Sequence, residues 1–248
     1  MKILVIPDVH LKPWMFDRAK ELMYTGAAEK AVCLMDIPDD WGQEHNLGLY
    51  EETFDAAIRF QKAYPDTLWC YGNHDLSYEW LQYESGFSYM AITVVRKKLM
   101  ELRRELPDRN QMVYIHRIDN VLFVHGGLTH ASVKYYAPDI DYEDTDAIIE
   151  RINCSGRNEM WDDTSPLWAR PQYHYEKMYR ESDILQVVGH TPVEEIDRIG
   201  NVISCDLFST YRTGEPIGTE EFLLIDTVTW EYRGIRTESS DRGQKRDQ

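Results

Sequence analysis

The most constraining feature of this sequence is that metal-binding side chains directly follow five of its short apolar runs. Because the carboxyl ends of parallel strands meet along one edge of a sheet, residues that are remote in sequence are expected to converge there. Polar residues that merely terminate strands would account for one or two of these positions, but not for all of them. The set, in chain order, is Asp8 and His10, Asp36 and Asp39, Asn73, His74 and Asp75, His125, and His190.

Short apolar or β-branched runs predict strands, since most are bounded by Gly, Pro, Asp or Asn. Helical periodicity over Phe16–Ala28 and Tyr50–Tyr64 separates the first three runs, and Met90–Leu106 predicts a further amphipathic helix. This alternation predicts βαβ crossovers and a largely parallel core of the α/β class, with antiparallel hairpins among the last strands. The predicted strands are Lys2–Ile6, Ala31–Met35, Thr67–Tyr71, Val121–Val124, Ile184–Val188, Val202–Ser204, Phe222–Ile225 and Trp230–Ile235.

The length of 248 residues predicts a single domain over residues 1–236, because α/β domains of this size commonly remain undivided. Residues 237–248 are polar and lack periodicity, which predicts a flexible tail. Residues 139–170 mix acidic side chains with tryptophans and a proline, and are expected to form an insertion of helix and loop that covers another part of the molecule.

The formal net charge of −16 has the wrong sign for a protein that holds DNA or RNA on an extended basic face. The four cysteines are far apart in sequence, so reduced thiols are expected rather than disulfides or a zinc finger. The first apolar run is too short for a signal segment, and no later run approaches the length of a membrane span. We therefore expect a cytoplasmic protein without a membrane partner or an extended nucleic-acid surface.

Two aspartates, an asparagine and three histidines of the set form a mixed oxygen and nitrogen ligand group. Such a mixed group suits Mn, Fe or Zn, whereas a calcium site consists of oxygen ligands alone. Asp36 is the natural bridge, because a carboxylate shared by two cations roughly 3.5–4 Å apart would let a hydroxide lie between them as nucleophile. A site of this kind binds a phosphoryl group and needs no covalent intermediate.

Five motifs resemble those of the calcineurin-like metallophosphoesterases, and they follow the family's order over nearly the whole chain. The last two are more similar to the serine/threonine protein phosphatase and diadenosine tetraphosphate hydrolase branch than to the nuclease and phosphodiesterase branch. The latter usually has a second histidine where Pro192 stands here. The motifs are DVH at Asp8–His10, DxxD at Asp36–Asp39, GNHD at Gly72–Asp75, HGGL at His125–Leu128 and GHTP at Gly189–Pro192.

The resemblance implies a calcineurin-like α/β sandwich of central β-sheets flanked by helices. It also implies two divalent or trivalent metal ions, with Mn as the first expectation and Fe or Zn as alternatives. His74 is similar to the family's general acid, which protonates the leaving oxygen while Asp39 orients its imidazole; the alternative for His74 is a hydrogen-bonding role beside the metals. Arg170, in a segment similar to one that reaches the substrate phosphate, is the implied substrate contact. The implied ligands are Asp8, His10 and Asp36 for the first metal, and Asp36, Asn73, His125 and His190 for the second.

The second motif departs from the family pattern GDxxDRG, because this chain has MDIPDDWG over Met35–Gly42. Asp40 replaces the arginine that helps to bind phosphate, and a carboxylate there repels an anionic substrate unless it is turned away or itself holds a cation. Met35 replaces a glycine, which is compatible with the turn if its φ stays negative. Trp41 either forms a flat wall for a nucleobase or is part of the core. His130, where relatives commonly have proline, is expected at the surface, with a substrate contact as the alternative.

These features predict a metal-dependent phosphoesterase that acts on phosphomonoesters, phosphoserine or phosphothreonine in a protein among them. The nearest alternative is a nucleotide-directed hydrolase that acts on a dinucleoside polyphosphate or a cyclic phosphodiester. The lost arginine at position 40 and the neighbouring Trp41 favour it. An alternative of another class is a metal-binding interaction module without turnover, but the retention of Asp39 and His74 argues against it.

Overall fold

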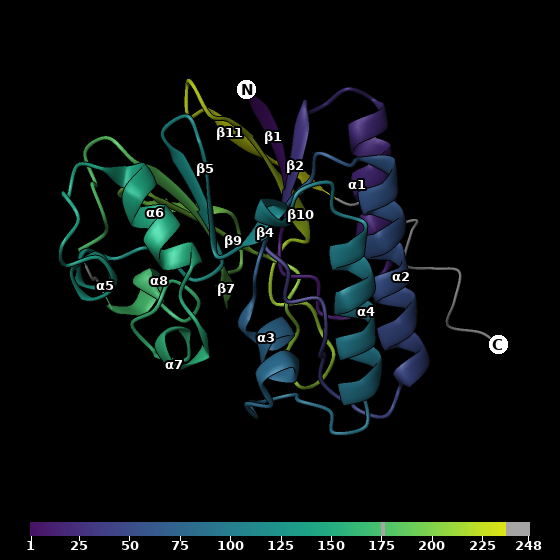
Figure 1. Cartoon of the computed structure of the whole chain (residues 1–248). Coiled ribbons are helices and arrows are strands. Elements are labelled where there is room, and N and C mark those ends of the chain that lie inside the picture. Colours follow the sequence, from purple (N-terminus) through teal and green to yellow (C-terminus); the bar gives the residue numbers. More distant parts are fainter. Residues whose placement is uncertain (175–176, 237–248) are drawn as a thin grey trace.

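The computed structural model describes residues 1–174 and 177–236, which form two β-sheets packed face to face with helices on their outer faces (Figure 1). The predicted tail over residues 237–248 lies outside the described residues. In sheet A the strand order is β11 (Tyr232–Arg236), β10 (Glu221–Asp226), β1 (Lys2–Ile6), β2 (Lys30–Cys33), β3 (Leu68–Cys70) and β4 (Met112–Val113). In sheet B it is β5 (Ile115–Ile118), β6 (Val121–Val124), β7 (Leu185–Pro192), β9 (Val202–Asp206) and β8 (Asp197–Ile199).

Each sheet combines a parallel part with antiparallel strands. Helices α1 (Trp14–Tyr24) and α2 (Leu47–Ala63) connect β1 to β2 and β2 to β3, so the predicted βαβ crossovers are confirmed. β10 and β11 form the predicted antiparallel hairpin, and β10 also pairs antiparallel with β1. In sheet B the strands β6, β7 and β9 are parallel, whereas β5 and β8 form antiparallel edges.

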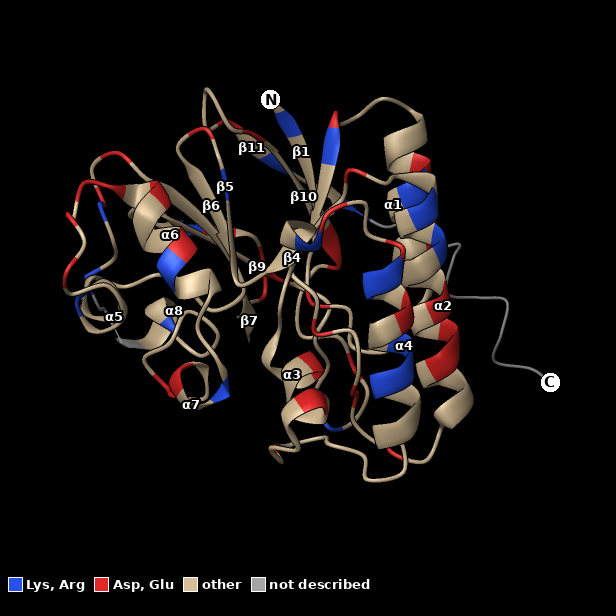
Figure 2. Ribbon diagram, viewed as in Figure 1, with Lys and Arg blue, Asp and Glu red and all other residues tan. Residues whose placement is uncertain are grey.

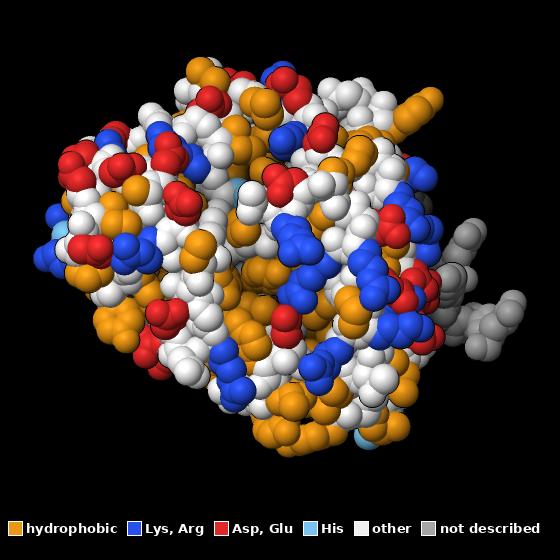
Figure 3. Space-filling view, in the orientation of Figure 1, with side chains coloured by type: hydrophobic (Ala, Val, Ile, Leu, Met, Phe, Trp, Pro, Cys, Tyr) orange, Lys and Arg blue, Asp and Glu red, His pale blue; other side chains and the backbone are white. Residues whose placement is uncertain are grey.

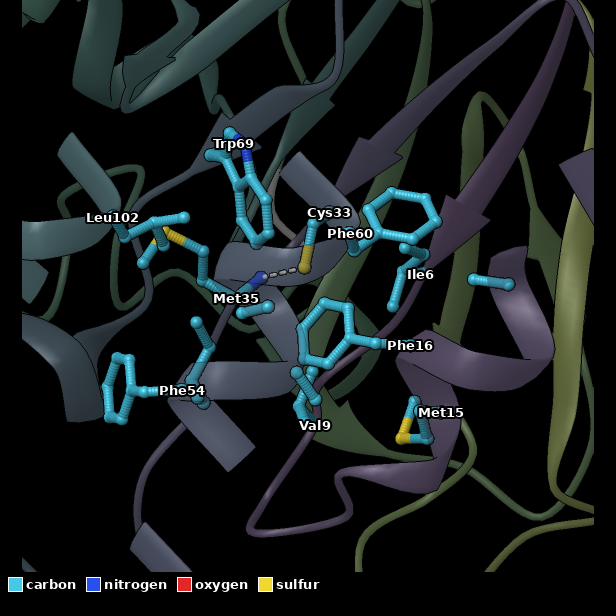
Figure 4. Packing of buried hydrophobic residues seen from close by; sticks show 14 of the residues in the cluster. Ile6, Val9, Met15, Phe16, Cys33, Met35, Phe54, Phe60, Trp69 and Leu102 are labelled. Atoms are coloured by element: carbon cyan, nitrogen blue, oxygen red, sulfur yellow. Dashed lines mark hydrogen bonds between the residues drawn. The ribbon is translucent and has the colours of Figure 1, made fainter. Parts of the chain in front are cut away.

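Alternation along the strands divides the apolar side chains between separate cores. In β1, Ile3 and Val5 face the space between the two sheets, whereas Leu4 and Ile6 face the helices of sheet A. Since successive side chains point to opposite faces, a strand that is covered on both faces is apolar throughout. The helix-side core, to which Phe16 of α1 belongs, is shown in Figure 4.

The outer face of sheet B is covered by the segment between β6 and β7. This segment contains α5 (His130–Tyr136), α6 (Thr145–Asn153), α7 (Arg157–Met160) and α8 (Pro171–His174). Ile148 and Ile152 of α6 belong to the same buried cluster as Leu122 and Val124 of β6. The cover predicted over residues 139–170 is therefore confirmed, and it lies over the sheet.

Charged side chains pair across the helices that cover sheet A. Lys98 of α4 (Ile92–Arg104) donates to Asp55 of α2 at 2.6 Å. Arg103 of α4 pairs with Glu79 of α3 (Asn73–Trp80). After α4, a short 3-10 helix (Arg109–Gln111) precedes β4. Figure 2 shows basic residues along α4 beside acidic residues along α2, and on the face seen in Figure 3 both signs of charge are interspersed. No helix within the described ranges is long and apolar enough to cross a membrane.

Candidate metal centre

The residues that the sequence places after strands converge around one cavity of about 520 Å³. They come from the loops that follow β1 and β2, from the first turn of α3, and from the end of β6 and the distal part of β7. Asp8 and His125 are fully buried and do not line the cavity. The predicted site residues that do line it are His10, Asp36, Asp39, Asn73, His74, Arg170 and His190.

Two groups of candidate ligands share Asp36. Ligand atoms of Asp8, His10 and Asp36 all lie within 4.8 Å of one another, and so do those of Asp36, His125 and His190. Asn73 lies with the second group, because its Oδ1 is 2.9 Å from His125 Nε2. Both sheets contribute, since His125 and His190 follow or belong to strands of sheet B. A carboxylate common to two groups is the arrangement by which one side chain bridges two cations.

The ring of His125 is oriented by its backbone partner. His125 Nδ1 donates to the carbonyl oxygen of Leu34 at 2.9 Å, so Nε2 faces Asp36 Oδ2 at 3.1 Å and Asn73 Oδ1 at 2.9 Å. A ring nitrogen and two acceptor oxygens repel one another unless a proton or a cation lies between them. Burial lowers the pKa of His125, but the neighbouring carboxylates of Asp36 and Asp8 outweigh burial and raise this pKa to about 9. The donor set therefore fits a cation.

Asp8 and His190 leave buried polar atoms without partners. The backbone N–H of His190 donates to Asp8 Oδ1 at 2.8 Å. Within the described part of the chain, Asp8 Oδ2 and His190 Nε2 have no hydrogen-bond partner. Burial and the nearby Asp206 raise the pKa of Asp8 well above its usual value, and burial lowers the pKa of His190. Because buried polar atoms are rarely left unsatisfied in native proteins, these atoms are also suited to metal ions.

Two glycines make room for the candidate carboxylate ligands. A Cβ atom at Gly72 would collide with Asp36 Oδ1, and a Cβ atom at Gly189 would collide with Asp8 Oδ2. These are the glycines of the GNHD and GHTP motifs. The close approach of a carboxylate to the backbone explains why both positions need a residue without a side chain.

His74 and Asp39 form the predicted dyad. His74 Nδ1 lies 2.9 Å from Asp39 Oδ2, and Asp39 Oδ1 accepts hydrogen bonds from the hydroxyls of Tyr50, at 2.8 Å, and Tyr78. The backbone N–H of His74 donates to Asp36 Oδ1 at 2.9 Å. Burial lowers the pKa of His74, but the surrounding carboxylates outweigh burial and raise it well above its usual value. Because Nδ1 is committed to Asp39, Nε2 is the nitrogen left for a substrate.

Two further carboxylates at the cavity were not singled out from the sequence. Glu84 accepts a hydrogen bond from Asn73 Nδ2 at 2.7 Å, its Oε2 lies 3.9 Å from His74 Nε2, and burial raises its pKa to about 7. Asp206 ends β9, is buried, and accepts from Ser209 Oγ at 2.9 and 3.0 Å. Asp206 follows an apolar run as the predicted residues do, so the same pattern could have found it. Glu84 lies in a loop without periodicity, where no such signal exists.

The backbone of the site is left-handed at several residues that are not glycine. The φ values are +43° at His10, +41° at Asp36, +68° at Asp39 and +62° at His190. The expectation that Met35 keeps a negative φ is wrong, because its φ is +60°. Its side chain is buried in the helix-side core, where a glycine would leave a void (Figure 4). Strained conformations of this kind persist only where the surrounding structure determines them.

The carboxylate of Asp40 is paired with the ammonium group of Lys12. Such pairing is one of the two ways in which a carboxylate beside a phosphate site can avoid repelling the substrate. Lys12 Nζ donates to Asp40 Oδ2 at 3.1 Å. Asp40 Oδ1 accepts from Thr210 Oγ1 at 2.6 Å and from the backbone N–H of Trp41 at 2.9 Å. Trp41 lines the cavity and is partly exposed, so it is not part of the core. The Arg212 guanidinium lies 4.8 Å from the centroid of the Trp41 ring.

Of the remaining predicted residues, one lines the cavity and two do not. Arg170 lines the cavity, and its Nη1 donates to the carbonyl oxygen of His190 at 2.9 Å and to Thr191 Oγ1 at 3.2 Å. Asp75 is buried outside the cavity lining, where its Oδ1 accepts from a backbone N–H at 3.3 Å. His130 is partly exposed and does not line the cavity, so the expected surface placement is confirmed.

Comparisons with known proteins identify the family. A family model described as calcineurin-like phosphoesterase matches residues 1–217, and no curated protein matches. Among solved structures, the chain is similar to an archaeal phosphodiesterase (16% identity, TM-score 0.45, covering 96% of this chain and 100% of that chain). It is also similar to a metallophosphoesterase from Sphaerobacter thermophilus (16% identity, TM-score 0.44, covering 96% and 89%) and to a hypothetical protein from Pyrococcus horikoshii OT3 (14% identity, TM-score 0.46, covering 96% and 88%). On the family match, this chain belongs to the calcineurin-like phosphoesterases and is a metal-dependent phosphoester hydrolase.

Proposed function

We propose that this protein hydrolyses phosphomonoesters at a centre of two metal ions, with phosphoserine and phosphothreonine in proteins as candidate substrates. The observation that supports this best is that the His74–Asp39 dyad and Arg170 line the same cavity as Asp36, the residue that the two candidate ligand groups share. Mn is the metal we propose, and Fe and Zn also suit mixed oxygen and nitrogen ligands. The ligands we assign are Asp8, His10 and Asp36 for the first ion, and Asp36, Asn73, His125 and His190 for the second.

The roles of the surrounding residues follow from their geometry. When bound, the two cations supply Lewis-acid activation of the attacking water and of a phosphoryl oxygen. Arg170 is anchored through Nη1, so the rest of its guanidinium fork is available to phosphoryl oxygens. His74 Nε2 gives its proton to the leaving oxygen, while His74 Nδ1 keeps its own proton and donates it in the hydrogen bond to Asp39. The hydroxyls of Tyr50 and Tyr78 hold Asp39 in place.

The branch that we propose is that of the serine/threonine protein phosphatases and diadenosine tetraphosphate hydrolases. It is supported by Pro192, which stands where the nuclease and phosphodiesterase branch has a second histidine. A nucleotide-directed hydrolase is the second candidate function. Trp41 supports it, because this partly exposed ring lines the cavity and could stack with a nucleobase once Arg212 moves aside.

Parallel assays with a chromogenic phosphomonoester and the matching phosphodiester, with and without Mn²⁺, test the proposal. We expect Mn²⁺-dependent hydrolysis with a preference for the monoester, and no hydrolysis by Asp36→Asn, which removes the shared ligand. Preference for the diester would replace the monoesterase proposal with the nucleotide-directed one. If neither is hydrolysed, dinucleoside polyphosphates are the next substrates, and inactivity on those as well would overturn the assignment of the dyad.

A further inference from the structure

The loop over residues 207–220, between β9 and β10, brings a second arginine to the cavity. Arg212 lines the cavity within a turn that is closed by a hydrogen bond from the Ile217 backbone N–H to the Ser209 carbonyl oxygen, at 2.9 Å. Among the described residues that line the cavity, Arg170 and Arg212 are the only lysines or arginines. Within the described residues, these two guanidinium groups are therefore the only Lys or Arg charges that the cavity lining offers to an anionic substrate.

A hydrogen bond ties this loop to the second motif. Asp40 Oδ1 accepts from Thr210 Oγ1 at 2.6 Å, and the two residues are 170 positions apart in sequence. The other oxygen of Asp40 accepts from Lys12 Nζ, which also donates to the carbonyl oxygen of His10 at 3.0 Å. Both oxygens of Asp40 are thus engaged, and its charge is offset by Lys12. Asp40 therefore connects the second motif to the loop that carries Arg212.

The guanidinium of Arg212 is free to bind an anion. Its central carbon lies over the Trp41 ring, 4.8 Å from the centroid, in a cation–π contact that engages no hydrogen-bond acceptor. No carboxylate in residues 1–174 or 177–236 forms an ion pair with it, although Asp40 and Glu84 also line the cavity. This contact favours one placement of the long Arg212 side chain, which reduces the entropy that substrate binding would have to restrict.

We propose that Arg212 is a substrate-binding guanidinium of this cavity, and that Asp40, through Thr210, is the residue that positions it. The inference rests on the proposed function, because it takes the substrate to be a phosphate ester. It accounts for the unusual carboxylate at position 40: the cation lost from the second motif is supplied by another loop, and the residue in its place holds that loop.

Substitution of Arg212 tests the binding role. Arg212→Ala should raise the KM for the chromogenic phosphomonoester and the inhibition constant of inorganic phosphate by about tenfold, as expected for the loss of one hydrogen-bonded charge. Turnover at saturation and bound Mn²⁺ should be unchanged, and Arg212→Lys should recover part of the affinity. Arg198→Ala is the matched control, because Arg198 also lies over a tryptophan, Trp230, but does not line the cavity.

A double-mutant cycle tests the positioning role of Asp40 and Thr210. Thr210→Val removes the hydroxyl that Asp40 accepts from and keeps the shape of the side chain, so it should raise KM in the presence of Arg212. In the Arg212→Ala background the same change should add almost nothing, because the guanidinium it positions is gone. Additive effects would show that Thr210 acts independently of Arg212 and would overturn the positioning role.

Calorimetric titration of the Mn²⁺-loaded protein with inorganic phosphate separates this inference from the proposed function. If the wild type hydrolyses none of the esters, but binds phosphate about tenfold more tightly than Arg212→Ala, the binding role stands and the proposed function fails. If the wild type turns over and Arg212→Ala matches Arg198→Ala in both KM and phosphate affinity, the proposed function stands and the inference is overturned.

Discussion

At the scale of single residues, the imidazole of His74 has one nitrogen committed and one available. Nδ1 is bound to Asp39 at 2.9 Å, so Nε2 can serve a leaving oxygen without taking part in metal binding. We expect His74→Asn to lower kcat by about 100-fold or more, which is the range of general acid catalysis, and to keep the Mn²⁺ content of the wild type. Steady-state kinetics and elemental analysis check both parts. His130→Asn, remote from the cavity, is the control, and loss of metal from His74→Asn would contradict the assignment.

Glu84 determines which atom of Asn73 faces the second ligand group. Its carboxylate accepts from Asn73 Nδ2 at 2.7 Å, and this fixes Oδ1, the only ligand atom of the amide, toward His125. Glu84→Leu should weaken Mn²⁺ binding about tenfold or more, whereas Glu84→Gln, which keeps an acceptor oxygen, should retain most of the affinity. Isothermal titration with Mn²⁺ measures both, with Glu101→Leu on α4 as control. Equal losses in the two Glu84 variants would point to its charge rather than to the orientation of Asn73.

The sequence predicts the candidate site residues that lie in motifs, but it misses residues such as Glu84 that reach the cavity through tertiary structure. Asp8, Asp36 and His190 stand directly after or within apolar runs, and the structure brings them together. Glu84 has no such position, and its role depends on how the α3–α4 loop folds back over Asn73. The left-handed backbone conformation of Met35 could not be predicted from the sequence either, because it accompanies burial of the side chain in the helix-side core and goes against the local preference of the residue.

At the scale of secondary structure, His116 of β5 joins the two sheets near β3 and β4. Its Nε2 contacts the carbonyl oxygens of Trp69, at 3.1 Å, and Gln111, at 3.2 Å, and burial lowers the pKa of this ring to about 4. The unfolded chain has the higher pKa and takes up the proton first, so His116 stabilises the fold fully above about pH 6.5, and this contribution is lost as the pH falls toward 4.

His116→Gln should therefore flatten the dependence of stability on pH. Between about pH 7.5 and pH 5 the free energy of unfolding of the wild type should fall by about 2 kcal/mol more than that of the variant. Urea unfolding at a series of pH values, with saturating Mn²⁺, measures the difference. Parallel pH curves for the two proteins would show that His116 does not change protonation on unfolding.

Hydrophobic periodicity predicts the long elements but not their ends or their neighbours. The first predicted helix continues to Ala28, whereas α1 ends at Tyr24, close to Gly26 with its φ of +74°. β7 continues to Pro192, because pairing with β9 extends beyond the apolar run. β4 has only two residues, too few for a pattern. That β1 lies between β2 and β10 depends on contacts between distant segments, which alternation along one strand does not reveal.

At the scale of the whole molecule, the metal ions should contribute to stability. Asp8, Asp36 and Asp206 are buried within one region of like charge, and cations relieve that repulsion only in the folded state. At a free Mn²⁺ concentration of about 1,000 times its Kd, one site adds about 4 kcal/mol, which corresponds to roughly 10 °C in Tm for a chain of this size. Thermal melts with Mn²⁺ and with EDTA check this, and equal Tm values would contradict it. Asp36→Asn should melt at nearly the same temperature in both.

The hydrogen bond between the His190 backbone and Asp8 spans 182 residues, and this separation bears on how the protein is made. Closing so long a loop has an entropic cost that only the contacts of both completed sheets offset. The site is therefore expected to be among the last parts to assemble. During synthesis, Asp8 leaves the ribosome long before its partner exists. Enzymatic activity therefore reports on completed folding, because a nascent chain that stops short of β7 lacks His190, one of the proposed metal ligands.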